Sequence, residues 1–190
     1  MIFDAAEIST FNVEPWATVI DGCRGKEFRQ FRAIEGYNYR TFIWLAHEMA
    51  GELFLDLGTK RGASAFALGS NKLNRVKSWD IDDAHRKHAG YAWPTIAGYD
   101  NIEFLKEDVM GSLADVPQAR VISLDVSHDG ETEKRYYEAL CELGFKGILF
   151  MDDIDYPKFA TLREFWGRIE KRKEILPWAH YSGLGVVYFE

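Results

Sequence analysis

Carboxylates and one histidine stand at the ends of two apolar segments in the second half of the chain. The first segment runs into Asp-x-x-His-Asp-Gly, which begins at Asp125 and includes His128, and the second ends in Asp152 and Asp153. If both segments are parallel strands, their carboxyl ends lie at one sheet edge and the three aspartates converge. Converging carboxylates repel each other unless a cation neutralises them, and oxygen ligands favour Mg²⁺. The residues therefore predict acid–base or metal-assisted chemistry at this edge.

A glycine turn earlier in the chain predicts a ligand site. Its pattern is Asp56-x-Gly58-x-x-x-Gly62-x-Ser64, between an apolar run and a segment with helical spacing. Glycine lets the backbone turn sharply and lets a ligand approach without meeting a Cβ. The dinucleotide fingerprint requires Gly-x-Gly-x-x-Gly. Here the third glycine is missing, and an acid within the strand suits a cationic ligand better than a phosphate. The alternative is a structural turn in which Asp56 caps something local.

A third acidic position follows the glycine turn at the separation expected for a ribose-binding residue. Asp80 lies about 20 residues beyond the turn, at the end of a short apolar segment. A carboxylate there can accept hydrogen bonds from both hydroxyls of a ribose. Asp82 would replace Asp80 if the strand were shifted. The alternative is that Asp82 and Asp83 only favour the dipole of a helix expected at residues 84–91.

The glycine turn resembles the first motif of class I S-adenosylmethionine-dependent methyltransferases, whose cofactor carries an amino group and a sulfonium but no phosphate. The resemblance implies that Asp56 lies near the amino-acid end of S-adenosylmethionine (SAM), Asp80 at the ribose and Asp108 beside the adenine. Trp79 or Val109 would supply an apolar wall to the ring. The cofactor-binding residues implied in this way are Asp56, Gly58, Thr59, Gly62, Ser64, Asp80, Asp108 and Asp125.

The acids and the histidine of the second half resemble the metal-dependent small-molecule O-methyltransferases of the macrocin and cephalosporin-tailoring type, and more distantly catechol O-methyltransferase. This resemblance covers about residues 50–190. It implies that Asp125, Asp152 and Asp153 hold Mg²⁺, which lowers the pKa of the acceptor oxygen. His128 would be the general base, with Asp125 as the second catalytic residue. Catechol-type enzymes differ, because they use a lysine base and an acid–amide metal pair. A helix-start residue without chemistry is the alternative for His128.

The elements that must position these residues predict an α/β fold. We expect a Rossmann-like, doubly wound, seven-stranded and mostly parallel sheet with an antiparallel last strand. Residues 1–36 show an irregular pattern, and we assign 1–38 to an N-terminal cap or lid and 39–190 to the methyltransferase domain. The expected strands are 53–57, 76–83, 102–106, 120–125, 147–153, 174–178 and 185–189, and the expected helices are 39–50, 62–70, 84–91, 131–143 and 159–171.

Composition limits the classes of partner. The net charge of −7 argues against nucleic acid, whose phosphates need a basic surface. No apolar stretch approaches the length of a membrane span, and the two distant cysteines, Cys23 and Cys141, fit reduced thiols in a cytoplasmic protein. We expect a small-molecule acceptor and leave a homodimer open. A nucleotide-dependent oxidoreductase or epimerase, and a non-catalytic SAM-binding module, are the alternative functions.

Overall fold

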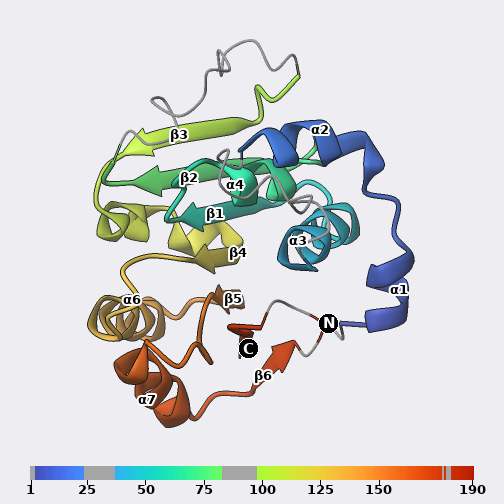
Figure 1. The fold of residues 1–190 in the computed structure, drawn as a ribbon. Helices are drawn as coiled ribbons and strands as arrows, with labels where there is room; N and C mark the ends of the chain where they lie inside the picture. The colour runs from blue at the N-terminus through green and yellow to red at the C-terminus, as the bar shows by residue number, and fades with distance from the viewer. Residues whose placement is uncertain (1–2, 24–36, 83–97, 177, 179–180) are drawn as a thin grey trace.

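A single seven-stranded sheet organises the chain in a computed structural model, which describes residues 3–23, 37–82, 98–176, 178 and 181–190 (Figure 1). The strand order is β3-β2-β1-β4-β5-β7-β6. Neighbouring strands from β3 to β5 pair in parallel, whereas β7 is antiparallel to both β5 and β6. The predicted sheet is therefore confirmed. The strands are β1 Leu53–Leu57, β2 Arg75–Asp80, β3 Ile102–Lys106, β4 Ala119–Leu124, β5 Gly147–Met151, β6 Lys173–Leu176 and β7 Leu184–Phe189.

Both faces of the central strands are covered, which is why β1 is apolar almost throughout. Alternate side chains of β1 point to opposite faces: Phe54 belongs to one buried cluster, and Leu53, Leu55 and Leu57 belong to the other. The first cluster includes residues of α1 Ala5–Thr10, α2 Glu14–Cys23, α3 Tyr37–Glu48 and α4 Ala63–Leu68. The second includes residues of α6 Glu131–Glu142, α7 Ala160–Arg168 and the 3₁₀ segments Val109–Ala114 and Val116–Gln118.

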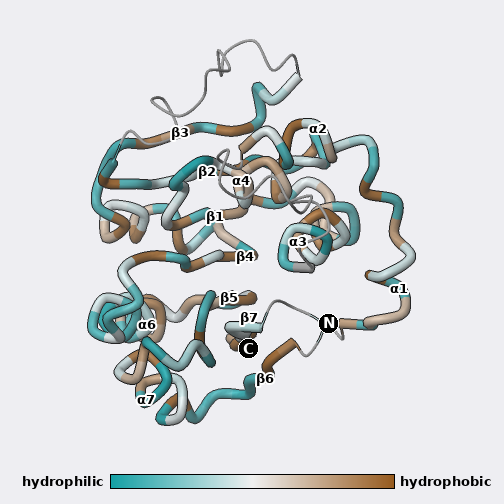
Figure 2. Tube along the Cα trace, viewed as in Figure 1, coloured by the Kyte–Doolittle hydropathy of each residue, from teal (hydrophilic) through white to brown (hydrophobic). Residues whose placement is uncertain are grey.

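The layers explain the distribution of polar residues. Figure 1 shows α1, α2 and α3 on one side of the sheet and α6 and α7 on the other. In Figure 2, β5 carries hydrophobic colours, whereas hydrophilic residues prevail along α6, whose outer side faces solvent.

Within the described part of the chain, the helices are too short or too polar to cross a membrane.

The N-terminal segment is more ordered than its sequence pattern predicts. The expectation of an irregular segment is wrong for residues 5–10 and 14–23, which form α1 and α2. Asp4 caps α1 by accepting hydrogen bonds from the backbone N–H groups of Ala6 and Glu7. Ile8 and Ile20 are fully buried in the first cluster, so these helices complete the core. Residues 24–36 lie outside the described residues, and a lid role for 1–38 stays a prediction.

Two predicted details of the helices are wrong. Leu143, the last residue of the helix expected at 131–143 and predicted from its spacing to be buried, is 46% exposed, because the helix ends at Glu142 before a turn in which Gly144 has φ +64°. The helix α7 ends at Arg168, three residues earlier than expected. The ammonium of Lys173 donates to the carbonyl oxygen of Trp166 at 2.6 Å and so satisfies the helix end. The helix expected at 84–91 lies outside the described residues.

The closest approach between backbone segments near the glycine turn occurs at Gly58. A Cβ added to Gly58 would lie 1.6 Å from the carbonyl oxygen of Asp125, and its φ is +98°. The two segments are also joined directly, because the N–H of Asp125 donates to the carbonyl of Leu57 at 2.8 Å. The sequence pattern predicts that glycine is needed here so that a ligand can approach the backbone. The structure shows a second requirement for glycine, because the backbone of Asp125 occupies the space that a side chain would need.

We therefore expect Gly58→Ala to destabilise the fold by about 3 kcal/mol or more, because both the space and the backbone angle oppose a side chain. Thermal unfolding should show Tm lowered by about 6 °C or more. Gly167→Ala is the matched control, since no atom lies within 4 Å of a Cβ at that position of α7. A Gly58→Ala variant as stable as Gly167→Ala would contradict this account.

Candidate active site

Two adjoining pockets lie at the carboxyl edge of the parallel strands and form one crevice. Both are lined by Gly58, Lys60 and Asp125. We call the first, of about 320 Å³, the α3 chamber, because Asn38 and Tyr39 of α3 line it. We call the second, of about 420 Å³, the β2 chamber, because it contains the end of β2. The close contact at Gly58 therefore lies where the chambers meet.

The β2 chamber contains the predicted ribose and adenine residues. Asp80 is held in place by two backbone donors, the N–H of Lys60 at 2.6 Å and the N–H of Asp82 at 2.8 Å. Asp108 lines the same chamber and caps a 3₁₀ segment by accepting from the N–H of Met110. Asp82, the proposed substitute, thus supports Asp80 through its backbone.

The apolar wall of the β2 chamber differs in part from the prediction. Val109 lines it as expected, whereas Trp79 is buried beneath the surface and does not line it. Ile81 lines it instead, with 73% of its surface exposed. The sequence signal that could have identified Ile81 is its position as a large apolar residue between Asp80 and Asp82, at the end of a predicted strand.

The α3 chamber brings together residues of both charges. Thr59, Ser64 and Asp125 line it as predicted. Lys60 and Arg61 line it as well, so cations and acids share one space. The methyltransferase resemblance implies that the segment 35–39, which includes Asn38 and Tyr39, overlies the cofactor or substrate mouth, and both of these residues line this chamber. The lining residues that were not predicted are Cys23, Phe42, Lys60, Arg61, Ala63, Ser123 and Leu184.

Asp56 and Gly62 support the glycine turn and line neither chamber. Asp56 is 1% exposed and accepts a hydrogen bond from the hydroxyl of Ser78 at 2.6 Å. The Ser78 hydroxyl also contacts that of Thr59, so Asp56 holds the turn from beneath. Burial raises the pKa of Asp56 to about 6. Gly62, with φ +86°, donates its N–H to the Thr59 carbonyl at 2.6 Å. A direct contact of Asp56 with a cofactor stays a prediction that this geometry does not favour.

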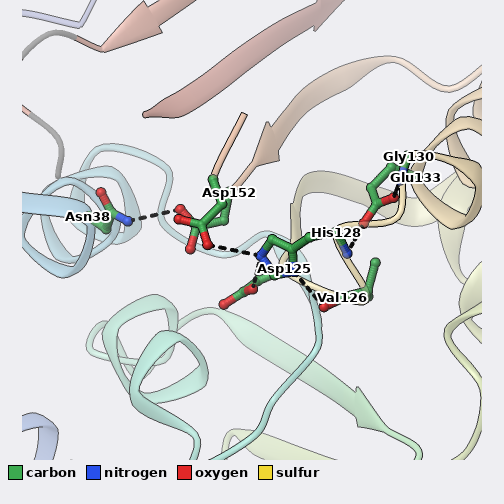
Figure 3. A network of polar contacts seen from close by, with 8 residues as sticks. Asn38, Asp125, Val126, His128, Gly130, Glu133 and Asp152 are labelled. Atoms are coloured by element: carbon green, nitrogen blue, oxygen red, sulfur yellow. Dashed lines mark hydrogen bonds and ion pairs between the residues drawn. The ribbon is translucent and has the colours of Figure 1, made fainter. Parts of the chain in front are cut away.

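His128 lies between two of the predicted metal-binding aspartates (Figure 3). Its Nε2 is 3.2 Å from Asp125 Oδ1 and 3.3 Å from Asp153 Oδ2, and its Nδ1 is 2.9 Å from the carbonyl oxygen of Val126. Its backbone N–H donates to Glu133, which also accepts from Gly130, and its φ is +58°. The ring is therefore fixed in position by contacts on both nitrogens and by its own backbone.

These contacts determine the charge of His128. A carbonyl oxygen lies beside Nδ1 and two carboxylates lie beside Nε2, so these surroundings favour a proton on both nitrogens, although Nε2 makes no well-aligned hydrogen bond to either carboxylate. Burial alone would lower the pKa of His128, but Asp125 and Asp153 outweigh it and raise that pKa to about 10. In this state the side chain is an imidazolium, which has no free electron pair to take a proton. General-base action by His128 stays a prediction, and it would require the ion pairs to open.

The three predicted metal ligands point to different partners in this structure. Asp125 and Asp153 face His128, whereas Asp152 accepts a hydrogen bond from Asn38 Nδ2 at 3.2 Å (Figure 3). Among the described residues, no three His, Cys, Asp or Glu side chains form a group that could hold a metal. The arrangement therefore does not fit the Mg²⁺ site expected from the sequence, and a cationic side chain stands between two of its acids. Mg²⁺ binding stays a prediction.

The charge of His128 makes a testable contribution to stability. Its folded-state pKa is raised, so its ion pairs stabilise the fold fully below about pH 6.5, and this contribution is lost as the pH rises through about 10. We expect His128→Gln to lower the free energy of unfolding by about 1 to 2 kcal/mol near pH 6 and by much less near pH 10. Urea unfolding at both pH values measures this; an equal loss at both would contradict it.

Comparison with known proteins identifies a family for the central part of the chain. The family described as "Methyltransferase domain" matches residues 55–154. No curated protein matches the chain.

Three solved structures share the fold at low identity. Cofactor-bound Rv0187 from MTB is 13% identical with a TM-score of 0.68, covering 97% of this chain and 94% of that one. The SAH-bound methyltransferase PaMTH1 of Podospora anserina is 14% identical with a TM-score of 0.62, covering 100% and 99%. The O-methyltransferase TomG of Streptomyces achromogenes, in complex with SAM, is 13% identical with a TM-score of 0.66, covering 97% and 93%. The chain belongs to the methyltransferase-domain family, as a class I SAM-dependent methyltransferase.

Proposed function

We propose that the protein transfers the methyl group of SAM to an oxygen atom of a small molecule. The observation that carries this proposal is the pair of chambers that meet at Gly58 and Asp125, with the Asp125–His128 ion pair beside the junction. A cofactor that spans both chambers brings its reactive centre to this pair. TomG, a neighbour of the same fold, is described as an O-methyltransferase in complex with SAM, which supports the choice of oxygen.

The β2 chamber suits the adenosine half of the cofactor. The carboxylate of Asp80 is fixed by two backbone donors and keeps lone pairs for the ribose hydroxyls. Ile81 and Val109 offer apolar surface to the adenine ring, and Asp108 lies at the same wall. The α3 chamber then receives the methionyl half together with the acceptor.

The residues at the junction can remove the proton of the acceptor. SAM supplies a methyl carbon whose bond to sulfur breaks as the acceptor oxygen attacks, which leaves a neutral sulfur and an acceptor proton to be removed. We assign that proton to the carboxylate of Asp125, because desolvation in the crevice and the negative charges of Asp152 and Asp153 raise the pKa of this group and make it a stronger base than an isolated carboxylate. The imidazolium of His128 holds Asp125 in its ionised form and fixes its orientation.

The assay is methyl transfer from radiolabelled SAM to a panel of phenolic, catecholic and sugar acceptors. Asp125→Asn keeps the shape of the side chain and removes its basicity, so we expect turnover to fall by about 100-fold or more. Asp129→Asn is the control, because Asp129 is an exposed acid of the same motif that accepts from the backbone of Glu131 and Thr132. Full turnover by Asp125→Asn would contradict the assignment. Cofactor binding without transfer to any acceptor would favour the non-catalytic module.

Mg²⁺ dependence and a homodimer remain predictions from the sequence. Holding the ion would require Asp125 and Asp153 to leave His128, and Asp152 to turn from Asn38. The same assay tests this: a chelator that abolishes transfer, and Mg²⁺ that restores it, would confirm a metal requirement. Sedimentation of the purified chain tests for a dimer.

A further inference from the structure

Asn38 joins the first turn of α3 to the end of β5. Its Nδ2 donates to Asp152 Oδ1 at 3.2 Å, a contact between residues 114 positions apart (Figure 3). It also lines the α3 chamber. Asn38 lies outside residues 55–154, the part that matches the family, and the resemblance places the segment 35–39 at the cofactor or substrate mouth without assigning a contact to Asn38.

Among the residues that the structure describes, the second polar atom of this amide has no hydrogen-bond partner. Asn38 Oδ1 is a buried acceptor without a donor. The orientation of the amide follows from Asp152, because turning the group over would set its oxygen against a carboxylate. Buried acceptors are nearly always satisfied, so an unsatisfied one beside a ligand chamber points to a donor that arrives with the ligand.

The charges of the α3 chamber indicate what that donor is. Asp125 and Asp152 line the chamber together with Lys60 and Arg61. A ligand group that uses both signs of charge within one small space is a zwitterion, and the methionyl end of SAM carries an ammonium and a carboxylate. Asp56, which the sequence places near that end, lies beneath the glycine turn instead.

We propose that Asn38 is a cofactor-binding residue. Its Oδ1 and the carboxylate of Asp152 accept hydrogen bonds from the α-ammonium of the cofactor, and Arg61 pairs with the α-carboxylate. The hydrogen bond from Asn38 Nδ2 keeps Asp152 beside the ammonium and apart from the Asp125–His128 pair. This inference rests on SAM as the cofactor of the proposed function, and it assigns the contacts of one end of that molecule.

The test compares two ligands that differ at this end. S-adenosylhomocysteine carries the amino-acid group, whereas 5′-methylthioadenosine lacks it. Calorimetric titration should show that Asn38→Ala raises the Kd of S-adenosylhomocysteine by about tenfold or more. The Kd of methylthioadenosine should change by less than about twofold. Asn38→Gln keeps both the acceptor and the donor of the amide, so S-adenosylhomocysteine should bind this variant more tightly than Asn38→Ala.

Two further variants separate the contacts. Arg61→Gln should raise the Kd of SAM by about tenfold and leave the Kd of decarboxylated SAM unchanged. Asn38→Ala should raise the Kd of both ligands. Arg40→Gln is the control on the same helix, because Arg40 contacts the carbonyls of Ser9 and Phe11 and does not line the chamber. It should change neither ligand.

Three results would overturn the inference. If Asn38→Ala lowers the affinity for S-adenosylhomocysteine and for methylthioadenosine equally, Asn38 has a structural role. If it lowers neither affinity, Asn38 does not contact the cofactor. If Asn38→Gln binds S-adenosylhomocysteine no better than Asn38→Ala does, the acceptor role is excluded. If the wild type binds neither SAM nor S-adenosylhomocysteine, the proposed function itself fails, which is a distinct outcome.

Discussion

The contact between Gly58 and the backbone of Asp125 is the constraint on which the candidate site depends. Because no side chain stands at Gly58, the turn after β1 lies against the end of β4, and the Asp125 N–H reaches the Leu57 carbonyl. That contact fixes the acid at the junction of the two chambers. A buried Asp56 bonded to Ser78 holds the same turn from below. The carboxylate that we propose as the base and the loop that we propose binds the cofactor are thus positioned by the same backbone contact.

Electrostatics then determines how the acids are used. Three aspartates at one sheet edge require positive charge, and the sequence alone suggests a metal ion for this purpose. In the structure the charge between Asp125 and Asp153 comes from His128, and Asp152 is paired with the amide of Asn38. The same residues can therefore satisfy one another without meeting at a single point. This division leaves Asp125, the proposed base, at the junction of the chambers and Asp152 within the α3 chamber.

Local sequence patterns predicted the sheet well, because a buried parallel strand is a short run of apolar residues that is visible in the sequence itself. The strands 53–57 and 102–106 were predicted with the bounds that the structure has. Contacts made across the fold leave no such local signal. Asn38 contacts Asp152 because the fold brings the start of α3 next to the end of β5. Asp56 is held inside the fold by a hydrogen bond from Ser78 of the neighbouring strand β2. The helices α1 and α2 were missed because tertiary burial of Ile8 and Ile20, rather than a long periodic pattern, stabilises them.

Calorimetric titration of SAM into the wild-type protein, with NAD⁺ titrated in parallel, tests the central claim most directly. The claim is that the crevice over Gly58 and Asp125 holds SAM across both chambers. It predicts saturable binding of about one SAM per chain, which S-adenosylhomocysteine displaces, and no binding of NAD⁺. Absence of any heat with SAM, or saturable binding of NAD⁺ at the same site, would contradict it.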